Sequence, residues 1–327
     1  KAEYERLFEV FAAHDIGYFF YNGGGDSQDT TYKVSQMAKK LKFPLQCIGI
    51  PKTVDNDLPF TDCSPGFGSV AKYVATSTLE AGLDVKSMTE TSTKVFILEV
   101  MGRHAGWIAA ASCLAATEAG DPPHIILLPE VPFEKAKFIS QVKQTVKNNG
   151  YCVIVASEGT QTKNGKFLAD SGTTDAFGHK QLGGVAPVLA SMISKIGLKN
   201  HWAVADYLQR SARHIASKTD LDQAYAVGKH AVKLAISGET AVMPVIKRIS
   251  NTPYKWKIET APLKNIANVE KTMPKNFISK NGFEITSSGK RYLSPLIVGE
   301  APCFYKNGIP DVASLKKYLV KKKLKSF

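Results

Sequence analysis

The stretch GYFFYNGGGDS, residues 17–27, indicates the fold class, because a short apolar run passes directly into three glycines and a polar segment. Residues 27–41 then carry apolar side chains at positions 34, 37, 38 and 41, which is the spacing of one helix face. A second apolar run, LQCIGI, follows at residues 45–50. This order predicts a strand, a helix and a second strand, the repeating unit of a parallel α/β sheet.

The same alternation continues beyond this unit. Further patterns indicate strands at residues 95–100, 124–128 and 151–156, and helices at residues 2–14, 68–81, 105–115 and 133–147. The predicted strands are apolar on both faces, the strand at residues 17–22 included, which is typical of parallel sheets covered by helices on both sides. Polar, glycine-rich segments at residues 162–184 and 249–289 are interpreted as surface insertions or domain crossings.

The composition limits the class of protein. The chain of 327 residues is long enough for two domains, and its apolar content of 44% is ordinary for a protein with a buried core. The apolar runs are far shorter than the roughly 20 residues of a membrane-spanning helix, and the chain opens without a secretory signal pattern. The five cysteines are scattered and form no CxxC pair, which indicates a reducing compartment. We therefore expect a cytoplasmic protein that does not contact a membrane.

The charge balance is strongly basic. Lysine and arginine number 42 against 29 aspartate and glutamate, and this charge of +13 suits nucleic acid, a membrane surface or a phosphorylated metabolite. We interpret a run of lysines near the C-terminus as a solvated helix face: Lys316, Lys317, Lys321, Lys322, Lys323 and Lys325. A nucleic-acid-binding or regulatory module would place basic residues among exposed aromatics and bind DNA with a steep salt dependence. The acidic residues cluster instead in short loops, so we expect no nucleic-acid partner.

Each of the five predicted strands is followed by a segment that contains glycines or charged residues. The segments that follow them are GGGDS (residues 23–27), PKTVDND (51–57), MGR (101–103), PE (129–130) and SEG (157–159). Ligands bind outside the carboxyl ends of the strands in open α/β sheets. The sequence therefore predicts a functional site where these segments meet.

Glycines 23–25 would let backbone N–H groups approach an anion at a helix N-terminus, although a plain tight turn also explains them. The run is neither a Walker A loop nor a Rossmann fingerprint. Asp55 and Asp57 can divide two tasks, because one carboxylate can accept a proton while the other holds magnesium. The alternative is a turn that caps the next element.

Three further features each have two interpretations. Arg103 suits the charge of a transferring phosphoryl group, or pairs with a carboxylate at a helix start. Glu158 accepts hydrogen bonds from sugar hydroxyls, or forms a buried ion pair. Tyr207 and Arg210, in DYLQRSARH, belong to a ligand-binding group or to the basic face of an amphipathic helix.

Together and in this order, GGGDS, PKTVDND, MGR, SEG and YLQR resemble the phosphofructokinase family at about its spacings, over residues 17–217. The resemblance implies two α/β lobes with mainly parallel sheets and an active-site cleft between them. Residues 1–66 and 214–327 would form the donor-side lobe, and residues 67–213 the sugar-phosphate-binding lobe. The family's N-terminal glycine-rich phosphate loop is not found in the sequence, so we expect the donor-side lobe to lack an N-terminal segment.

The resemblance also implies phosphoryl transfer to the 1-hydroxyl of fructose 6-phosphate. Asp55 would be the general base, Asp57 would help to place magnesium and charge, and Thr53 would lie against the transferred group. The implied substrate-binding residues are Met101 and Gly102 beside Arg103, Glu158 for sugar hydroxyls, Arg210 for the 6-phosphate, Tyr207, and Lys94, which would reach in from a neighbouring subunit. We therefore expect a homodimer or homotetramer with shared active sites.

Two positions bear on the phosphoryl donor. ATP-using members resemble GGDGS and PGTIDND, whereas here Asp26 stands at the last glycine of the first motif and Lys52 at the glycine of the second. Asp26 would repel the α-phosphate of ATP and Lys52 would bind a shorter donor, so with Gly24 and Gly25 they favour pyrophosphate. Gly25 stands where many members carry a magnesium-binding aspartate, so Asp26 and Asp57 are the expected ligands. The alternatives are an ATP-dependent kinase and an enzyme for another sugar phosphate, such as sedoheptulose 7-phosphate.

Overall fold

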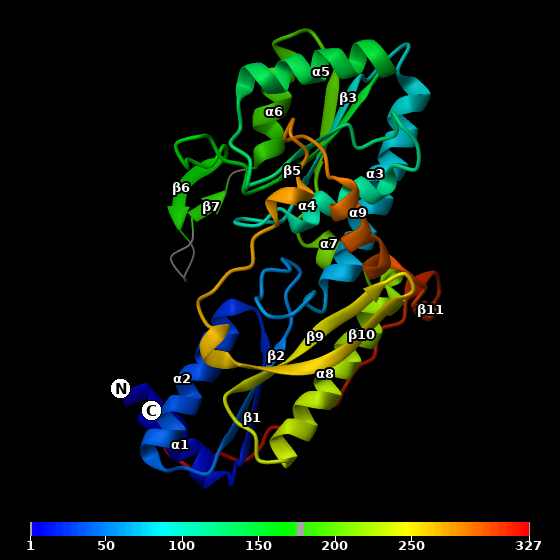
Figure 1. Cartoon of the computed structure of the whole chain (residues 1–327). Helices are drawn as coiled ribbons and strands as arrows, with labels where there is room; N and C mark the ends of the chain where they lie inside the picture. Colours follow the sequence, from blue (N-terminus) through cyan, green and yellow to red (C-terminus); the bar gives the residue numbers. More distant parts are fainter. Residues whose placement is uncertain (1, 175–179, 183, 327) are drawn as a thin grey trace.

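Two four-stranded sheets, each flanked by helices, organise the computed structural model (Figure 1), which describes residues 2–174, 180–182 and 184–326. The first sheet contains, in spatial order, β1 (Tyr18–Gly23), β2 (Gln46–Pro51), β9 (Val242–Asn251) and β10 (Tyr254–Pro262). Its first three strands run parallel, whereas β10 runs antiparallel to β9. The second sheet is parallel throughout and contains β4 (Ile125–Leu127), β5 (Cys152–Ser157), β3 (Val95–Val100) and β8 (Asn200–Val204).

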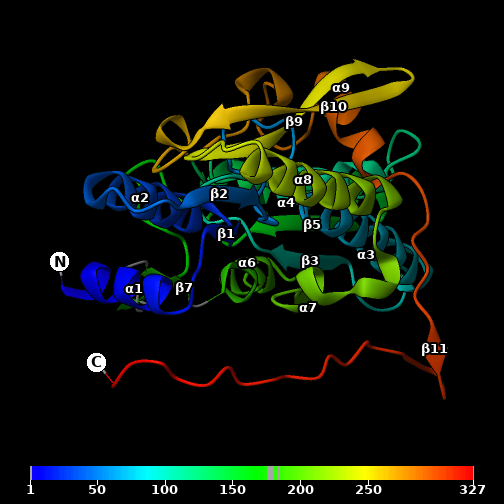
Figure 2. The same cartoon turned by 90° about the horizontal axis from the view of Figure 1, so that it is seen from below.

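Helices pack on both sheets (Figure 2): α2 and α8 contact the first sheet, and α3, α4, α5 and α6 contact the second. The described helices are α1 (Ala2–Ala13), α2 (Gly25–Leu41), α3 (Phe67–Met88), α4 (Trp107–Ala111), α5 (Lys135–Asn149), α6 (Val185–Ser194), α7 (Leu208–Ser211), α8 (Lys218–Ile236) and α9 (Ser287–Leu293). Two short hairpins pair β6 (Asp170–Thr174) with β7 (Lys180–Leu182) and β11 (Tyr305–Lys306) with β12 (Ile309–Pro310). In the part of the chain that the structure describes, no helix is long and apolar enough to cross a bilayer.

The largest hydrophobic cluster joins α3 and α4 to the second sheet. Phe67 and Ile108 are fully buried in it, and Leu293 and Leu296 enter it from the C-terminal part of the chain. The amide of Ile126, in β4, also donates to the carbonyl of Phe283 at 2.9 Å. Residues C-terminal to position 214 thus pack against the second sheet, although they were predicted to belong to the other lobe. The division into domains at residues 66 and 214 stays a prediction.

The fold class predicted from the sequence is confirmed, since the five predicted strands appear as β1 to β5 with bounds shifted by one residue at most. The prediction that residues 17–22 form a buried strand is wrong in its burial. Tyr18 is 53% exposed, and Phe20 and Tyr21 are also exposed. The physical reason is position, because β1 is the last strand of its sheet and pairs only with β2 among the described strands. Apolar composition indicates a strand but does not distinguish an edge from the centre.

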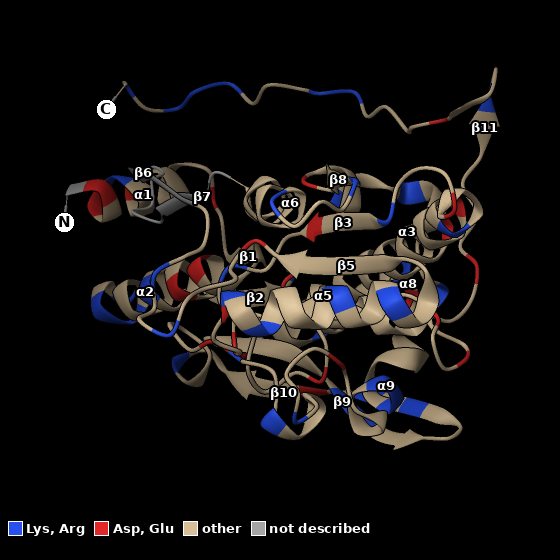
Figure 3. Cartoon of the chain, turned by 90° about the horizontal axis from the view of Figure 1, so that it is seen from above, with Lys and Arg blue, Asp and Glu red and all other residues tan. Residues whose placement is uncertain are grey.

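Some elements were not predicted. Strand β10 lies inside the polar segment 249–289, and no strand was predicted at β8 or β9. The helix expected at the C-terminal lysines is also absent: residues 311–326 are extended and run beside the body of the molecule, with their lysines exposed (Figures 2 and 3). A short helix is marginal in water without an apolar face packed on the protein, and this segment has no such packing.

Candidate active site

A cavity of about 840 Å³ lies at the carboxyl ends of β1, β2, β3 and β5. Most of the residues that the sequence analysis selected line it: Gly24, Gly25, Asp26, Thr53, Asp55, Asp57, Met101, Arg103, Glu158 and Arg210. They come from both sheets, so the cavity lies where the carboxyl edges of the two sheets meet. The structure thus brings these side chains to one place, and their individual roles stay predictions.

The glycine segment after β1 forms the entry to α2. The helix begins at Gly25 with Gly24 as its N-cap, and no side chain caps its first amides. The amide of Lys52 donates to the carbonyl of Gly23 at 3.1 Å, which joins this segment to the loop after β2. The unpaired N–H groups and the positive end of the helix dipole therefore lie at the cavity, where they suit a phosphate group. Asp26 lies in the first turn and is exposed.

The loop after β2 carries the first carboxylate. The Thr53 hydroxyl donates to Asp55 Oδ2 at 3.3 Å, and the Asp55 amide lies 3.2 Å from the same Thr53 oxygen. Burial raises the pKa of Asp55, while the hydrogen bond from Thr53 and the positive charges of Lys52, Arg103 and Arg210 oppose that rise. A carboxylate whose pKa is raised by burial is a stronger base than one in water.

Asp57 is the second carboxylate, and its environment differs. Burial, followed by the negative charge of Asp55, raises the pKa of Asp57 to about 6. Its Oδ1 atom is buried and has no hydrogen-bond partner among the described residues. A buried carboxylate oxygen without a partner is costly, so this atom is suited to receive a cation.

The loops after β3 and β5 of the second sheet place the Arg103 guanidinium and a third carboxylate, Glu158, at the cavity. The amide of Gly102 donates to Glu158 Oε1 at 3.3 Å, and the Ser157 hydroxyl donates to the Gly102 carbonyl. Burial raises the pKa of Glu158, whereas the Gly102 hydrogen bond and the charge of Arg103 lower it. Arg103 Nε is buried without a partner in the described structure, so its guanidinium retains a free donor at the cavity.

Other predicted site residues lie outside the cavity lining. Lys52 is exposed but close enough for its charge to lower the pKa of Asp55. Gly102 is buried behind the cavity wall. Tyr207 is 62% exposed, with the Arg210 guanidinium 4.0 Å above the centre of its ring. Lys94 precedes β3, at the opposite end of the strand from the cavity, and its ammonium donates to the Thr89 carbonyl.

One wall of the cavity was not predicted from the sequence. Asn268, Val269 and Glu270 line it, and Glu270 Oε1 lies 2.9 Å from His104 Nδ1, which follows Arg103. The next residue, Lys271, is held beneath the loop of Asp57 by its own amide, which donates to the Asp57 carbonyl at 2.6 Å. Burial lowers the pKa of Lys271 to about 8. No described strand ends directly before these residues, so the rule that located the other loops could not have found them.

An α/β fold whose sheets present paired carboxylates and arginines to a helix N-terminus has the arrangement of a phosphotransferase. A model of the phosphofructokinase family matches residues 1–235, and the chain belongs to this family. It is 63% identical, over its full length and 78% of the relative, to a pyrophosphate--fructose 6-phosphate 1-phosphotransferase of Halomonas elongata. An enzyme of the same name in Methylococcus capsulatus is 59% identical over 99% of the chain and 77% of the relative.

The structural comparison agrees with this assignment. The crystal structure of a pyrophosphate-dependent phosphofructokinase from Marinobacter aquaeolei matches with a TM-score of 0.91 and 61% identity, and covers 99% of this chain and 78% of that one. A second pyrophosphate-dependent phosphofructokinase, from Nitrosospira multiformis, matches with a TM-score of 0.93 and 59% identity, over 100% of this chain and 79% of that one.

Proposed function

We infer that the protein transfers a phosphoryl group from pyrophosphate to the 1-hydroxyl of fructose 6-phosphate, giving fructose 1,6-bisphosphate and phosphate. The observation that carries this proposal is the single cavity in which Asp55, Arg103 and Arg210 converge. The names of the relatives at 59–63% identity support the same substrates. With pyrophosphate as the donor, we also infer that the reaction is nearly reversible.

The chain's own residues account for the proton and the charge. Asp55 accepts the proton of the sugar hydroxyl as the oxygen–phosphorus bond forms and the bridging bond of pyrophosphate breaks. Burial moves the pKa of Asp55 towards neutral pH, which makes the carboxylate a better base. The hydrogen bond from Thr53 orients the Asp55 carboxylate. Arg103 neutralises charge on the transferring group. Glu158 and Arg210 bind the sugar hydroxyls and the 6-phosphate, respectively.

Magnesium is the proposed metal, and the residues present fit it. Asp57 offers a buried oxygen without a partner, and Asp26 adds a carboxylate at the cavity. Magnesium commonly takes only one or two protein carboxylates and completes its shell with water and substrate phosphates. When bound it would neutralise negative charge on the phosphates of the donor.

A shared active site is also proposed. Lys94 lies at the far end of β3, away from the cavity of its own chain. We propose that it serves the cavity of a neighbouring chain. The neighbouring edge strand β8 exposes Trp202 and Val204, at 47% and 40%. We therefore propose a homodimer or homotetramer, in the cytoplasm, where the protein's free cysteines would stay reduced.

The first experiment measures turnover of fructose 6-phosphate by the full chain, with magnesium, using pyrophosphate or ATP. We expect turnover with pyrophosphate and little with ATP. Turnover with ATP alone would keep the sugar substrate and reject the donor assigned from Asp26 and Lys52. If neither donor works on fructose 6-phosphate, the proposed function is wrong, and turnover of sedoheptulose 7-phosphate would then identify the alternative substrate.

A further inference from the structure

Asn56, which stands between the two carboxylates, controls their direction. Its φ of 55° places it in the left-handed region, and the residue is fully buried. Asp55 directly precedes Asn56, and Asp57 directly follows it. Because the backbone turns at Asn56, both carboxylates line the cavity. Whatever holds the side chain of Asn56 therefore also holds the two carboxylates.

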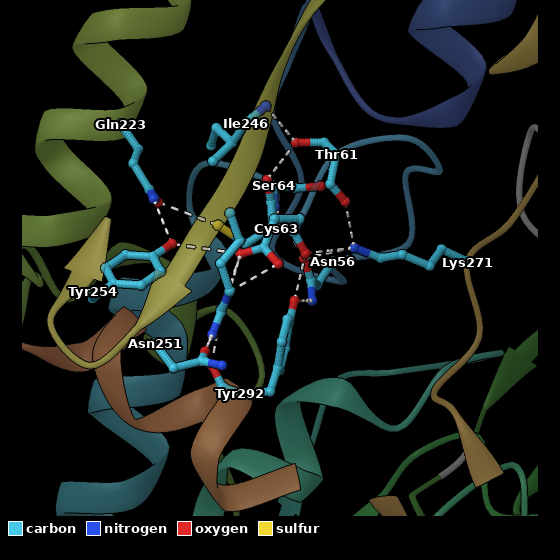
Figure 4. Close-up of polar contacts among 12 residues, drawn as sticks. Asn56, Thr61, Cys63, Ser64, Gln223, Ile246, Asn251, Tyr254, Lys271 and Tyr292 are labelled. Carbon is cyan, nitrogen blue, oxygen red and sulfur yellow. Dashed lines mark hydrogen bonds and ion pairs between the residues drawn. The ribbon is translucent and has the colours of Figure 1, made fainter. Parts of the chain in front are cut away.

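Every polar atom of the Asn56 side chain has a partner (Figure 4). Its amide nitrogen donates to the Tyr292 hydroxyl at 3.0 Å. Its oxygen accepts from the Ser64 amide at 2.9 Å and from Lys271 Nζ at 3.4 Å. Of these partners, Lys271 is the one that directly follows the missed wall of the cavity, residues 268–270.

Lys271 is tied to the same loop by more than one bond. Its ammonium donates to the carbonyls of Thr61 at 3.1 Å and Asp62 at 3.0 Å, and it lies 5.3 Å above the centre of the Trp107 ring. Its backbone amide donates to the Asp57 carbonyl, and its own carbonyl accepts from Trp107 Nε1 at 3.0 Å. The ammonium is enclosed, although part of the side chain remains accessible.

The same segment reaches the loop that carries Arg103. The amide of Met273 donates to the Glu130 carboxylate at 3.2 Å, and that carboxylate also accepts from the Gly106 amide at 3.0 Å. Residues 268–273 therefore connect the carboxylate loop after β2 with the start of α4 beyond Arg103. A shift of this segment would change the distance between the base and the arginine.

We propose that Lys271 is a positioning residue for phosphoryl transfer, which holds Asn56 and thereby sets Asp55 and Asp57 against Arg103. The proposal rests on the proposed function and adds to it a residue that touches no substrate. A positioning role differs from a purely structural one in its kinetics. Misplacing the base by a fraction of an ångström lowers kcat, while the binding groups Glu158 and Arg210 stay where they are.

The test compares Lys271→Met with Lys271→Arg in the full chain. Lys72→Met is the matched control, because Lys72 is a second enclosed lysine and donates to the Gly299 carbonyl and to Glu300, away from the cavity. We expect Lys271→Met to lower kcat about 100-fold with KM for both substrates within about threefold, and Lys271→Arg to recover at least a tenth of the activity. Lys72→Met should keep kcat. An unchanged kcat in Lys271→Met, or an equal loss in Lys72→Met, would overturn the proposal.

Amide hydrogen exchange supplies a measurement that needs no turnover. The Ser64 amide reports on the loop because it bonds to Asn56, and its exchange should become about tenfold faster in Lys271→Met but not in Lys72→Met. Unchanged exchange at residues 55–64 rejects the positioning role whatever the kinetics show. If wild-type protein does not turn over fructose 6-phosphate, the proposed function fails separately, and hydrogen exchange still decides the role of Lys271.

Discussion

The loop at residues 53–57 and the loop at residues 101–103 both line the cavity, but they are held by different means. Side chains from distant parts of the chain hold the first loop: Tyr292 and Lys271 bond to Asn56. Close backbone packing holds the second. A Cβ atom on Gly159 would lie 2.0 Å from the carbonyl oxygen of Arg103, so the two backbones touch there.

This difference matches what each loop carries. The first loop presents two carboxylates whose mutual repulsion and burial oppose the folded geometry, so it needs hydrogen bonds that fix it. The second loop presents one arginine, and glycines let it lie directly against the end of β5. Removing a hydrogen-bond partner should therefore displace the first loop. Adding a side-chain atom to a glycine at the backbone contact should displace the second loop.

The largest effect should come from removing the base of the first loop. Asp55→Asn keeps the shape of the residue but cannot accept the proton, so we expect kcat to fall about 1,000-fold with little change in KM. Steady-state kinetics at saturating pyrophosphate measure this. Asp222→Asn, which removes an exposed carboxylate paired with Lys218, serves as the control and should keep full activity. A loss below tenfold in Asp55→Asn would mean that another group is the base.

The second loop should break when Gly159 becomes alanine. The added methyl group meets backbone atoms of Arg103, which cannot rotate away, so the arginine must shift and kcat should fall about 100-fold. Gly228→Ala in α8 is the matched control, because its Cβ would meet nothing within 4 Å. That variant should keep kcat and gain about 0.5–1 kcal/mol of unfolding free energy. Equal kinetics in the two variants would show that the close approach at Gly159 has no role.

The two loops also differ in how far the sequence predicted them. Asp55, Arg103 and Glu158 directly follow apolar strands, and the rule that ligands bind at strand ends was enough to group them. Lys271 and Glu270 do not directly follow a strand, and they reach the site through contacts more than 150 residues apart in the sequence, which no local pattern contains. The exposure of β1 escaped prediction for a related reason, because the edge of a sheet is set by which strands pair.

A smaller effect tests the cost of burying the charge of Asp57 beside Asp55. The pKa of Asp57 rises from 3.8 to about 6 on folding, so between these values the folded state binds more protons than the unfolded state, and stability falls as pH rises. The rise corresponds to at most roughly 3 kcal/mol. Metal-free Asp57→Asn should therefore be about 2 kcal/mol more stable than wild type at pH 7.5, and the difference should vanish towards pH 4. Urea unfolding at several pH values measures it. A difference that does not change with pH would contradict the assigned cause.

The smallest effect separates the support of the first loop from general stability. Tyr292 and Tyr254 both face Arg248, and both hydroxyls bond in the same network (Figure 4). The Tyr292 hydroxyl accepts from Asn56 at 3.0 Å, whereas the Tyr254 hydroxyl accepts from Gln223 at 2.9 Å.

Phenylalanine at either position leaves one buried donor unpaired, so each variant should lose about 1 kcal/mol of unfolding free energy in urea. Only Tyr292→Phe frees the side chain between the two carboxylates, so only this variant should lower kcat, by about fivefold. Because both changes remove one oxygen atom from the same network, a difference in kcat at equal stability isolates the orientation of Asp55 and Asp57. Equal kcat values would mean that Asn56 is held without Tyr292, and that Lys271 and the Ser64 amide suffice.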